Sequence, residues 1–247
     1  MRSRLQNNYS TLYSQPLPTE RRFNLWPYAL GVVLLACLGM LGWWIFFSQA
    51  SIGLFGSASE PTDSDRTVTL TLAGQRFFIP ESYLRTRAQR SGGDVDQIDI
   101  HALWPTMNGF SEAEGEDFRD KSANSRVIYI TLAAPTQVWR PAERFYQVYP
   151  YYFASPEEPA EYGLKTRRMA EDSGVADHDV LYHQGDDRFT LFHCLRDKPD
   201  LMPADCVGDK VIEPRILARY RFRRSMLAEW REIDTMIEEL LAGFAGH

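Results

Sequence analysis

The stretch ILARYRFRRSMLAEWREIDTMIEELLAGF, residues 216–244, determines the fold class that the sequence predicts. Residues 216–222 alternate apolar and polar side chains, and a period of two is typical of a β-strand with one buried face. Tyr220 and Phe222 are expected to face a core, while the arginines beside them face water. This alternation accounts for the densest basic run of the chain better than a phosphate- or lipid-binding patch does.

The second part of the stretch predicts one long amphipathic helix. Its apolar residues recur every three or four positions, which places them on a single helix face. They are Met226, Trp230, Ile233, Ile237, Leu240 and Phe244. The acidic residues predicted on the solvated side are Glu229, Glu232, Asp234, Glu238 and Glu239. The apolar stripe is expected to cover a sheet, and docking into a partner is the alternative.

The same alternation predicts strands elsewhere in the chain. These strands are residues 67–72, 75–79, 96–103, 126–132, 180–183 and 188–194. Glycine-containing turns join the first two and the last two, which are therefore predicted to form hairpins. A short helix is predicted over residues 141–149, between two prolines. Hairpins and one long terminal helix together predict an α+β domain with a mainly antiparallel sheet.

Residues 25–47 form a long apolar segment without a charged side chain. At about 1.5 Å per residue, a helix of this length spans roughly 34 Å, which is enough for a bilayer core. Trp26 and Tyr28 stand at one end and Trp43 and Trp44 at the other, as expected of aromatic side chains at membrane interfaces. The segment predicts a retained transmembrane anchor. The alternatives are a cleaved signal and a buried helix.

The charges on either side of this segment predict its orientation. Residues 1–24 contain four arginines and one glutamate, a net charge of +3, and no Lys or Arg follows the segment until Arg66. The positive-inside rule then places the N-terminus in the cytoplasm. The whole chain carries −6, so −9 remains outside residues 1–24. Such an acidic body argues against nucleic-acid binding, which requires basic surface.

The predicted organisation therefore has four parts, located at the bacterial inner membrane. These parts are a cytoplasmic arm (residues 1–24), a transmembrane helix (25–47), a linker (48–66) and a periplasmic α+β domain (67–247). The partners expected for this organisation are the lipid bilayer, through one helix, and a protein in the membrane or the periplasm.

Cys194 and Cys206 are predicted to form a disulfide, because the periplasm is an oxidising compartment. Closing this loop stabilises the fold by about 3 kcal/mol in the chain-entropy model. Cys37 lies within the apolar segment and has no expected partner in the chain. Zinc ligation by the two cysteines with His183 and His193 is the alternative, but the spacing matches no zinc motif. No metal or cofactor is predicted.

The aromatic stretch VWRPAERFYQVYPYYF, residues 138–153, is a candidate binding surface. Tyr and Trp are favoured at interface hot spots, although they are equally common in cores. The partner-binding candidates are Trp139, Phe145, Tyr149, Tyr151 and Tyr152. Core packing is the favoured interpretation of most of this stretch.

Motifs for catalysis are absent from the sequence: it contains no phosphate-binding glycine loop, nucleophile elbow or zinc-protease helix. The best cluster of ionisable residues surrounds His178 and Asp179. A hairpin register in which paired residue numbers sum to about 372 brings Asp179 opposite His193. A histidine held by a carboxylate is a usable general base. An envelope hydrolase using His178, Asp179 and His193 is therefore the alternative function.

Three segments resemble uncharacterised single-pass inner-membrane proteins of Gram-negative bacteria that have a periplasmic domain. They are IHALWPTMNGF (residues 100–110), FHC…C (192–206) and RFRRSMLAEW (221–230). The resemblance implies no activity and no catalytic residue. The single anchor and the compact body predict a non-enzymatic domain that binds a protein, as an envelope accessory or assembly factor or as a toxin-immunity protein. A periplasmic ligand sensor is a further alternative.

Overall fold

The computed structural model describes residues 61–186, 188–196 and 203–245, which all belong to one compact unit, Ser57–His247. Within these ranges, no helix combines the length and the apolar character needed to cross a membrane. The predicted cytoplasmic arm, the transmembrane helix, Cys37 and most of the linker lie outside the described residues. So do the four predicted anchor residues, Trp26, Tyr28, Trp43 and Trp44.

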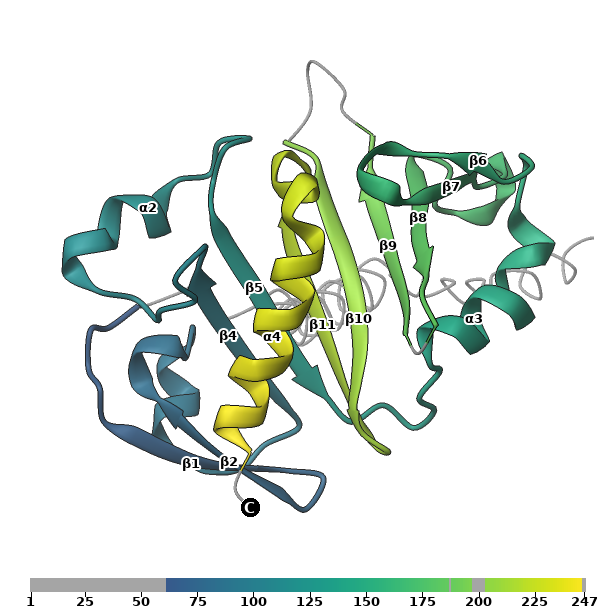
Figure 1. The fold of residues 1–247 in the computed structure, drawn as a ribbon. Helices are drawn as coiled ribbons and strands as arrows, with labels where there is room; N and C mark the ends of the chain where they lie inside the picture. The colour runs from purple at the N-terminus through teal and green to yellow at the C-terminus, as the bar shows by residue number, and fades with distance from the viewer. Residues whose placement is uncertain (1–60, 187, 197–202, 246–247) are drawn as a thin grey trace, which may run out of the picture. The chain divides into compact units, whose positions relative to one another are not determined.

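Two sheets form the framework of the described chain (Figure 1). The smaller has the order β2-β1-β3, with β1 at Thr67–Leu72, β2 at Gln75–Pro80 and β3 at Gly93–Asp94. The larger has the order β4-β5-β11-β10-β9-β8-β7-β6. Its strands are β4 (Gln97–Leu103), β5 (Val127–Ala133), β6 (Glu158–Pro159), β7 (Lys165–Arg168), β8 (His178–Gln184), β9 (Phe189–Leu195), β10 (Asp205–Glu213) and β11 (Ile216–Arg223).

Three α-helices accompany the sheets: α2 (Gly115–Arg119), α3 (Pro141–Gln147) and α4 (Trp230–Phe244). Short 3₁₀ segments connect many of the elements. The two used below are η4 (Tyr149–Tyr152), which follows α3, and η7 (Arg224–Glu229), which leads from β11 into α4.

The predicted α+β class is confirmed. All neighbouring strands of the larger sheet are antiparallel, and only the short β1–β3 contact is parallel. Both predicted hairpins form, β1 with β2 and β8 with β9. The sequence reasoning missed β10, because its centre contains Gly208, Asp209 and Lys210 instead of alternating apolar residues.

Each face of the larger sheet is covered over part of its width. Helix α4 crosses it over β5, β11 and β10 (Figure 1), and its apolar residues join one core cluster with the inward side chains of β11. Tyr220 and Phe222 are each 1% exposed, as the alternation predicts. On the opposite face, Phe145 of α3 and Tyr149 of η4 form a second cluster over β8 and β9.

One residue of α4 departs from the predicted pattern. Asp234 was expected on the solvated side, but it is only 3% exposed, so this prediction is wrong. The buried face of the helix is wider than the predicted apolar stripe. Leu241, which lies outside the stripe, is buried, whereas Leu240, which belongs to it, is only partly buried. A carboxylate is tolerated in such a place only when it is paired and hydrogen-bonded, and the partners of Asp234 are described below.

The predicted disulfide between Cys194 and Cys206 is present. The two residues lie directly opposite each other on β9 and β10, with Cα atoms 4.0 Å apart. The bond therefore joins the two strands where their pairing begins. This position matters for the site, because the same two strands separate further along.

Gly208 of β10 lies opposite Tyr220 of β11 and leaves room for its ring. A Cβ atom added at Gly208 would lie 2.5 Å from a ring carbon of Tyr220, closer than any real contact. The absence of a side chain at Gly208 therefore allows the Tyr220 ring to cross the strand and reach α4.

We expect Gly208→Ala to destabilise the fold by about 2 kcal/mol, since it displaces a fully buried ring and its hydrogen bond. The matched control is Gly243→Ala in α4, where an added Cβ meets nothing within 4 Å. Alanine there should stabilise the helix by up to about 1 kcal/mol. Urea unfolding followed by circular dichroism measures both changes. Equal effects of the two substitutions would contradict the role given to Gly208.

Candidate functional site

A cleft opens where β9 and β10 separate. Their pairing runs from Cys206 opposite Cys194 to Gly208 opposite Phe192 and ends there. Beyond that point, β10 continues to Glu213. Among the described strands, it pairs there with β11 but not with β9. The cleft has a volume of about 610 Å³ and is lined by the diverging ends of both strands.

Two helices close the cleft on opposite faces of the sheet. The α4 wall contributes Asp234 and Glu238, and the other wall is the start of α3 with its preceding residue Arg140. The apolar part of the lining comes mainly from the strands. It consists of Phe189, Val211 and Ile212, with alanines and Pro141 from the helices.

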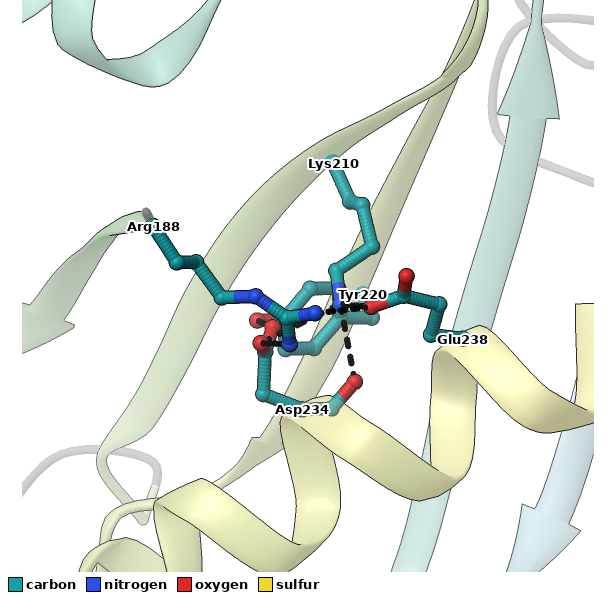
Figure 2. A network of polar contacts seen from close by, with 5 residues as sticks. All are labelled: Arg188, Lys210, Tyr220, Asp234 and Glu238. Atoms are coloured by element: carbon teal, nitrogen blue, oxygen red, sulfur yellow. Dashed lines mark hydrogen bonds and ion pairs between the residues drawn. The ribbon is translucent and has the colours of Figure 1, made fainter. Parts of the chain in front are cut away.

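A polar network occupies the α4 side of the cleft, and Asp234 is its centre (Figure 2). The buried Tyr220 hydroxyl donates to Asp234 Oδ1 at 2.6 Å. Lys210 Nζ lies 3.1 Å from Asp234 Oδ2 and donates to the Asp234 carbonyl at 2.9 Å. Arg188 Nη1 lies 3.2 Å from the same Oδ2 atom. One buried carboxylate therefore holds Tyr220 of β11, Lys210 of β10 and Arg188, which directly precedes β9.

Glu238, one helical turn further along α4, completes the network. Lys210 Nζ and Arg188 Nη2 each lie 2.9 Å from its Oε2 atom. The hydrogen bond from Lys210 and the nearby positive charges lower the pKa of Glu238, although desolvation partly opposes them. Burial, followed by the charge of Asp234, raises the pKa of Tyr220 well above its ordinary value. Tyr220 is therefore a hydrogen-bond donor at any physiological pH.

We expect Asp234→Ala to destabilise the fold by about 3 kcal/mol, because it leaves the buried Tyr220 hydroxyl without its acceptor and removes one of the two carboxylates that neutralise the Lys210 ammonium. The control is Glu238→Ala, which removes a half-exposed carboxylate that binds the same two cations. Its cost should stay below about 1 kcal/mol, as for other exposed ion pairs. Chemical unfolding of both variants provides the comparison, and similar losses would show that Asp234 is not the centre.

A second set of polar contacts lies on the α3 side of the cleft. Asp209 is nearly buried between Arg144 of α3, at 2.7 Å, and Arg219 of β11, at 2.8 Å. Burial raises the pKa of Asp209, but the hydrogen bond from Arg219 and the charge of Arg144 outweigh it, so the net pKa is lowered. Tyr149 Oη lies 2.6 Å from His193 Nε2 beside this pair. Asp209 and His193 therefore both have close partners, whereas the buried Nε atom of Arg144 has no hydrogen-bond partner among the described residues.

The proposed pairing of Asp179 with His193 is wrong. In the observed register Asp179 lies opposite Cys194, and His193 lies opposite Val180. The paired numbers sum to 373, because the Gly185 N–H donates to the Arg188 carbonyl and closes a tighter turn than the sequence suggested. A shift of one residue places the two side chains on opposite faces of the sheet. The Asp179–His193 contact on which the hydrolase hypothesis was built is therefore not formed.

Both members of that predicted pair have other partners. Asp179 binds Arg196 at 2.8 Å and Arg224 at 3.1 Å. His193 contacts Tyr149, and His178 lies opposite Leu195 near the end of the hairpin. In the described ranges, no group of three or more His, Cys, Asp or Glu side chains is placed to hold a metal ion.

The environment of His193 predicts a pH dependence. Burial lowers its pKa from 6.5 to about 4, and the charge of Arg144 acts in the same direction. The unfolded chain therefore binds a proton between these pH values that the folded chain excludes. The contribution of His193 to the free energy of unfolding should be fully present above pH 6.5. It should fall as the pH drops towards 4, by up to about 3 kcal/mol.

We expect His193→Gln to reduce this acid sensitivity, because glutamine does not titrate and its carbonyl still accepts from Tyr149. Some sensitivity should remain, since burial also lowers the pKa of His101 to about 4. The control, His183→Gln, removes a histidine from the neighbouring strand. Melting temperatures measured between pH 7 and pH 4.5 test the difference. A wild-type slope in His193→Gln would refute the assignment.

The predicted partner-binding residues divide into two groups. Phe145 and Tyr149 are buried and belong to the second core cluster. Trp139 is half-buried, whereas Tyr151 is 85% exposed and Tyr152 is 43% exposed. The structure thus leaves two of the five candidates accessible to a partner.

Sequence reasoning missed most residues of the cleft. Tyr146 of α3 is 54% exposed, and its ring packs against Phe189 at the cleft. Arg188 and Lys210 lie far apart in the sequence and meet only through α4. The one available signal was the i, i+4 pair of acidic residues at 234 and 238, which resembles an ordinary solvated helix face.

No family model and no curated protein matches this chain. Two solved structures have a similar fold. One is an immunity protein of the Stenotrophomonas maltophilia type IV secretion system, with a TM-score of 0.54 and 16% identity over 77% of this chain and 99% of that chain. The other is the Neisseria meningitidis iron-regulated outer membrane lipoprotein FrpD, with a TM-score of 0.48 and 13% identity over the same shares. At such identities the likeness concerns the fold alone.

Proposed function

We propose that this chain is a non-enzymatic protein-binding domain that acts as an immunity protein and neutralises a toxin. The observation that carries the proposal is the fold: an antiparallel sheet with a C-terminal helix, similar over nearly the whole length of an immunity protein of a type IV secretion system. The anchor expected at residues 25–47 adds the periplasm to the proposal, as the compartment in which the toxin is met.

The arrangement of charged groups supports binding over catalysis. Asp234, Asp209 and His193 are each held by at least one close partner from another element. These partners are other residues of the fold, so each side chain has a structural role that accounts for its position. Interlocked groups of this kind make a rigid surface, and rigidity lowers the entropic cost of binding a protein.

Competition between bacteria tests the proposal. We expect a strain that lacks this chain to be killed in contact with its wild-type parent, because the parent delivers the toxin and the mutant lacks the protection. The full chain supplied in trans should restore survival. The control is a parent whose secretion apparatus is inactive, which should leave the mutant unharmed. A mutant that survives contact with the intact parent would contradict the immunity role.

A further inference from the structure

We propose that the cleft between β9 and β10 receives an extended segment of a partner protein, which pairs with the open edge of β10 as an added strand. This inference builds on the proposed function, since it specifies how the domain holds its protein partner. It rests on the direction of backbone groups, on the network that fixes the two edges of the cleft and on the character of the lining.

The direction of the backbone groups follows from hydrogen bonds at the two ends of the β8–β9 hairpin. The Gly185 N–H donates to the Arg188 carbonyl, and the Arg196 N–H donates to the Asp177 carbonyl, both at 2.9 Å. Alternate residues of an antiparallel strand direct their N–H and C=O groups to opposite neighbours. The even-numbered residues of β9 therefore face β8, and the backbone groups of Phe189 face β10.

The same alternation applies to β10. His193 faces β10, and Val207 lies opposite it, so the odd-numbered residues of β10 direct their backbone groups towards β9. The ladder ends at Gly208 opposite Phe192, before Val211 and Phe189 would meet. The register of β10 with β11 holds as far as Val211 and shifts at a bulge directly after it. The N–H of Val211 and the N–H and C=O of Phe189 thus point into the cleft. Backbone groups in such a position require hydrogen-bond partners.

The two edges are held in place before any partner arrives. Arg188, directly before β9, and Lys210 of β10 are both bound to Asp234 and Glu238 of α4. Their side chains therefore fix the two strands to one rigid helix (Figure 2). An edge that is fixed in this way loses little entropy when a strand is added.

The lining favours a peptide as the occupant. Val211, Ile212 and Phe189 provide apolar surface, while the charges of Arg188 and Lys210 are already compensated by Asp234 and Glu238. A charged small molecule would have to displace these ion pairs. An extended segment with apolar side chains at alternate positions satisfies both the apolar lining and the exposed backbone groups, as in other cases of β-strand addition.

Hydrogen exchange of the full-length chain in detergent tests the open edge without any partner. We expect the amide of Val211 to exchange much faster than the amide of Lys210, because Lys210 directs its N–H to β11. The amide of Phe189 should exchange faster than that of Thr190 for the corresponding reason. Equal protection within each pair would show that the edges are closed and would overturn the proposal.

Panning of a phage-displayed library of random dodecapeptides on the full-length chain tests the occupant. We expect the selected peptides to alternate apolar and polar residues and to protect the amides of Val211 and Phe189 when bound. Val211→Pro removes the N–H group and should weaken binding about tenfold, the loss expected for one backbone hydrogen bond. Val211→Thr keeps the N–H group and should bind nearly as the wild type does.

The outcomes separate this proposal from the proposed function. Peptides that protect other surfaces, such as the exposed Tyr151, would overturn strand addition even if the competition experiment succeeds. Peptides that protect the cleft would support strand addition even if the parent strain does not kill the mutant in the competition experiment. Should Val211→Pro fail to fold by circular dichroism, the exchange footprint of the wild-type chain decides. Dimerisation of the free chain through Val211 would identify a second copy as the occupant and would overturn a separate partner.

Discussion

The contact of Asp234 with Tyr220, Lys210 and Arg188 is the interaction on which the rest of the structure depends. A carboxylate on the buried face of α4 is costly to desolvate, and it persists because three donors surround it: Tyr220 of β11, Lys210 of β10 and Arg188 directly before β9. The interaction sets the position of the terminal helix along the sheet. It also fixes the strand ends that form the cleft.

The geometry of this contact begins at Gly208. Only a residue without a side chain lets the Tyr220 ring cross β10 and reach the helix. The disulfide between Cys194 and Cys206 joins the same strands nearby, so β9 and β10 are bonded at one end and open at the other. A covalent link holds the paired end of the two strands, and a polar network holds the open end.

These features are consistent with the proposed role in binding. Asp179 and His193 lie on opposite faces of the β8–β9 hairpin, and each has another partner. The fold is similar to that of an immunity protein of a type IV secretion system, and at 16% identity the likeness concerns the fold alone. Under the proposed function, the cleft and the exposed tyrosines of η4 are the surfaces available for recognising a partner.

The sequence alone determined the elements whose patterns are local: the hairpins, the alternation of β11 and the amphipathic α4. It also predicted the disulfide, because an oxidising compartment was expected. It did not reveal β10, the buried position of Asp234 or the cleft. The physical reason is that side-chain periodicity reports which face of an element is buried, but not which distant charges will meet there. A one-residue difference in a turn moved His193 to the other face, and only tertiary contacts turned Asp234 from a solvated residue into the centre of the site.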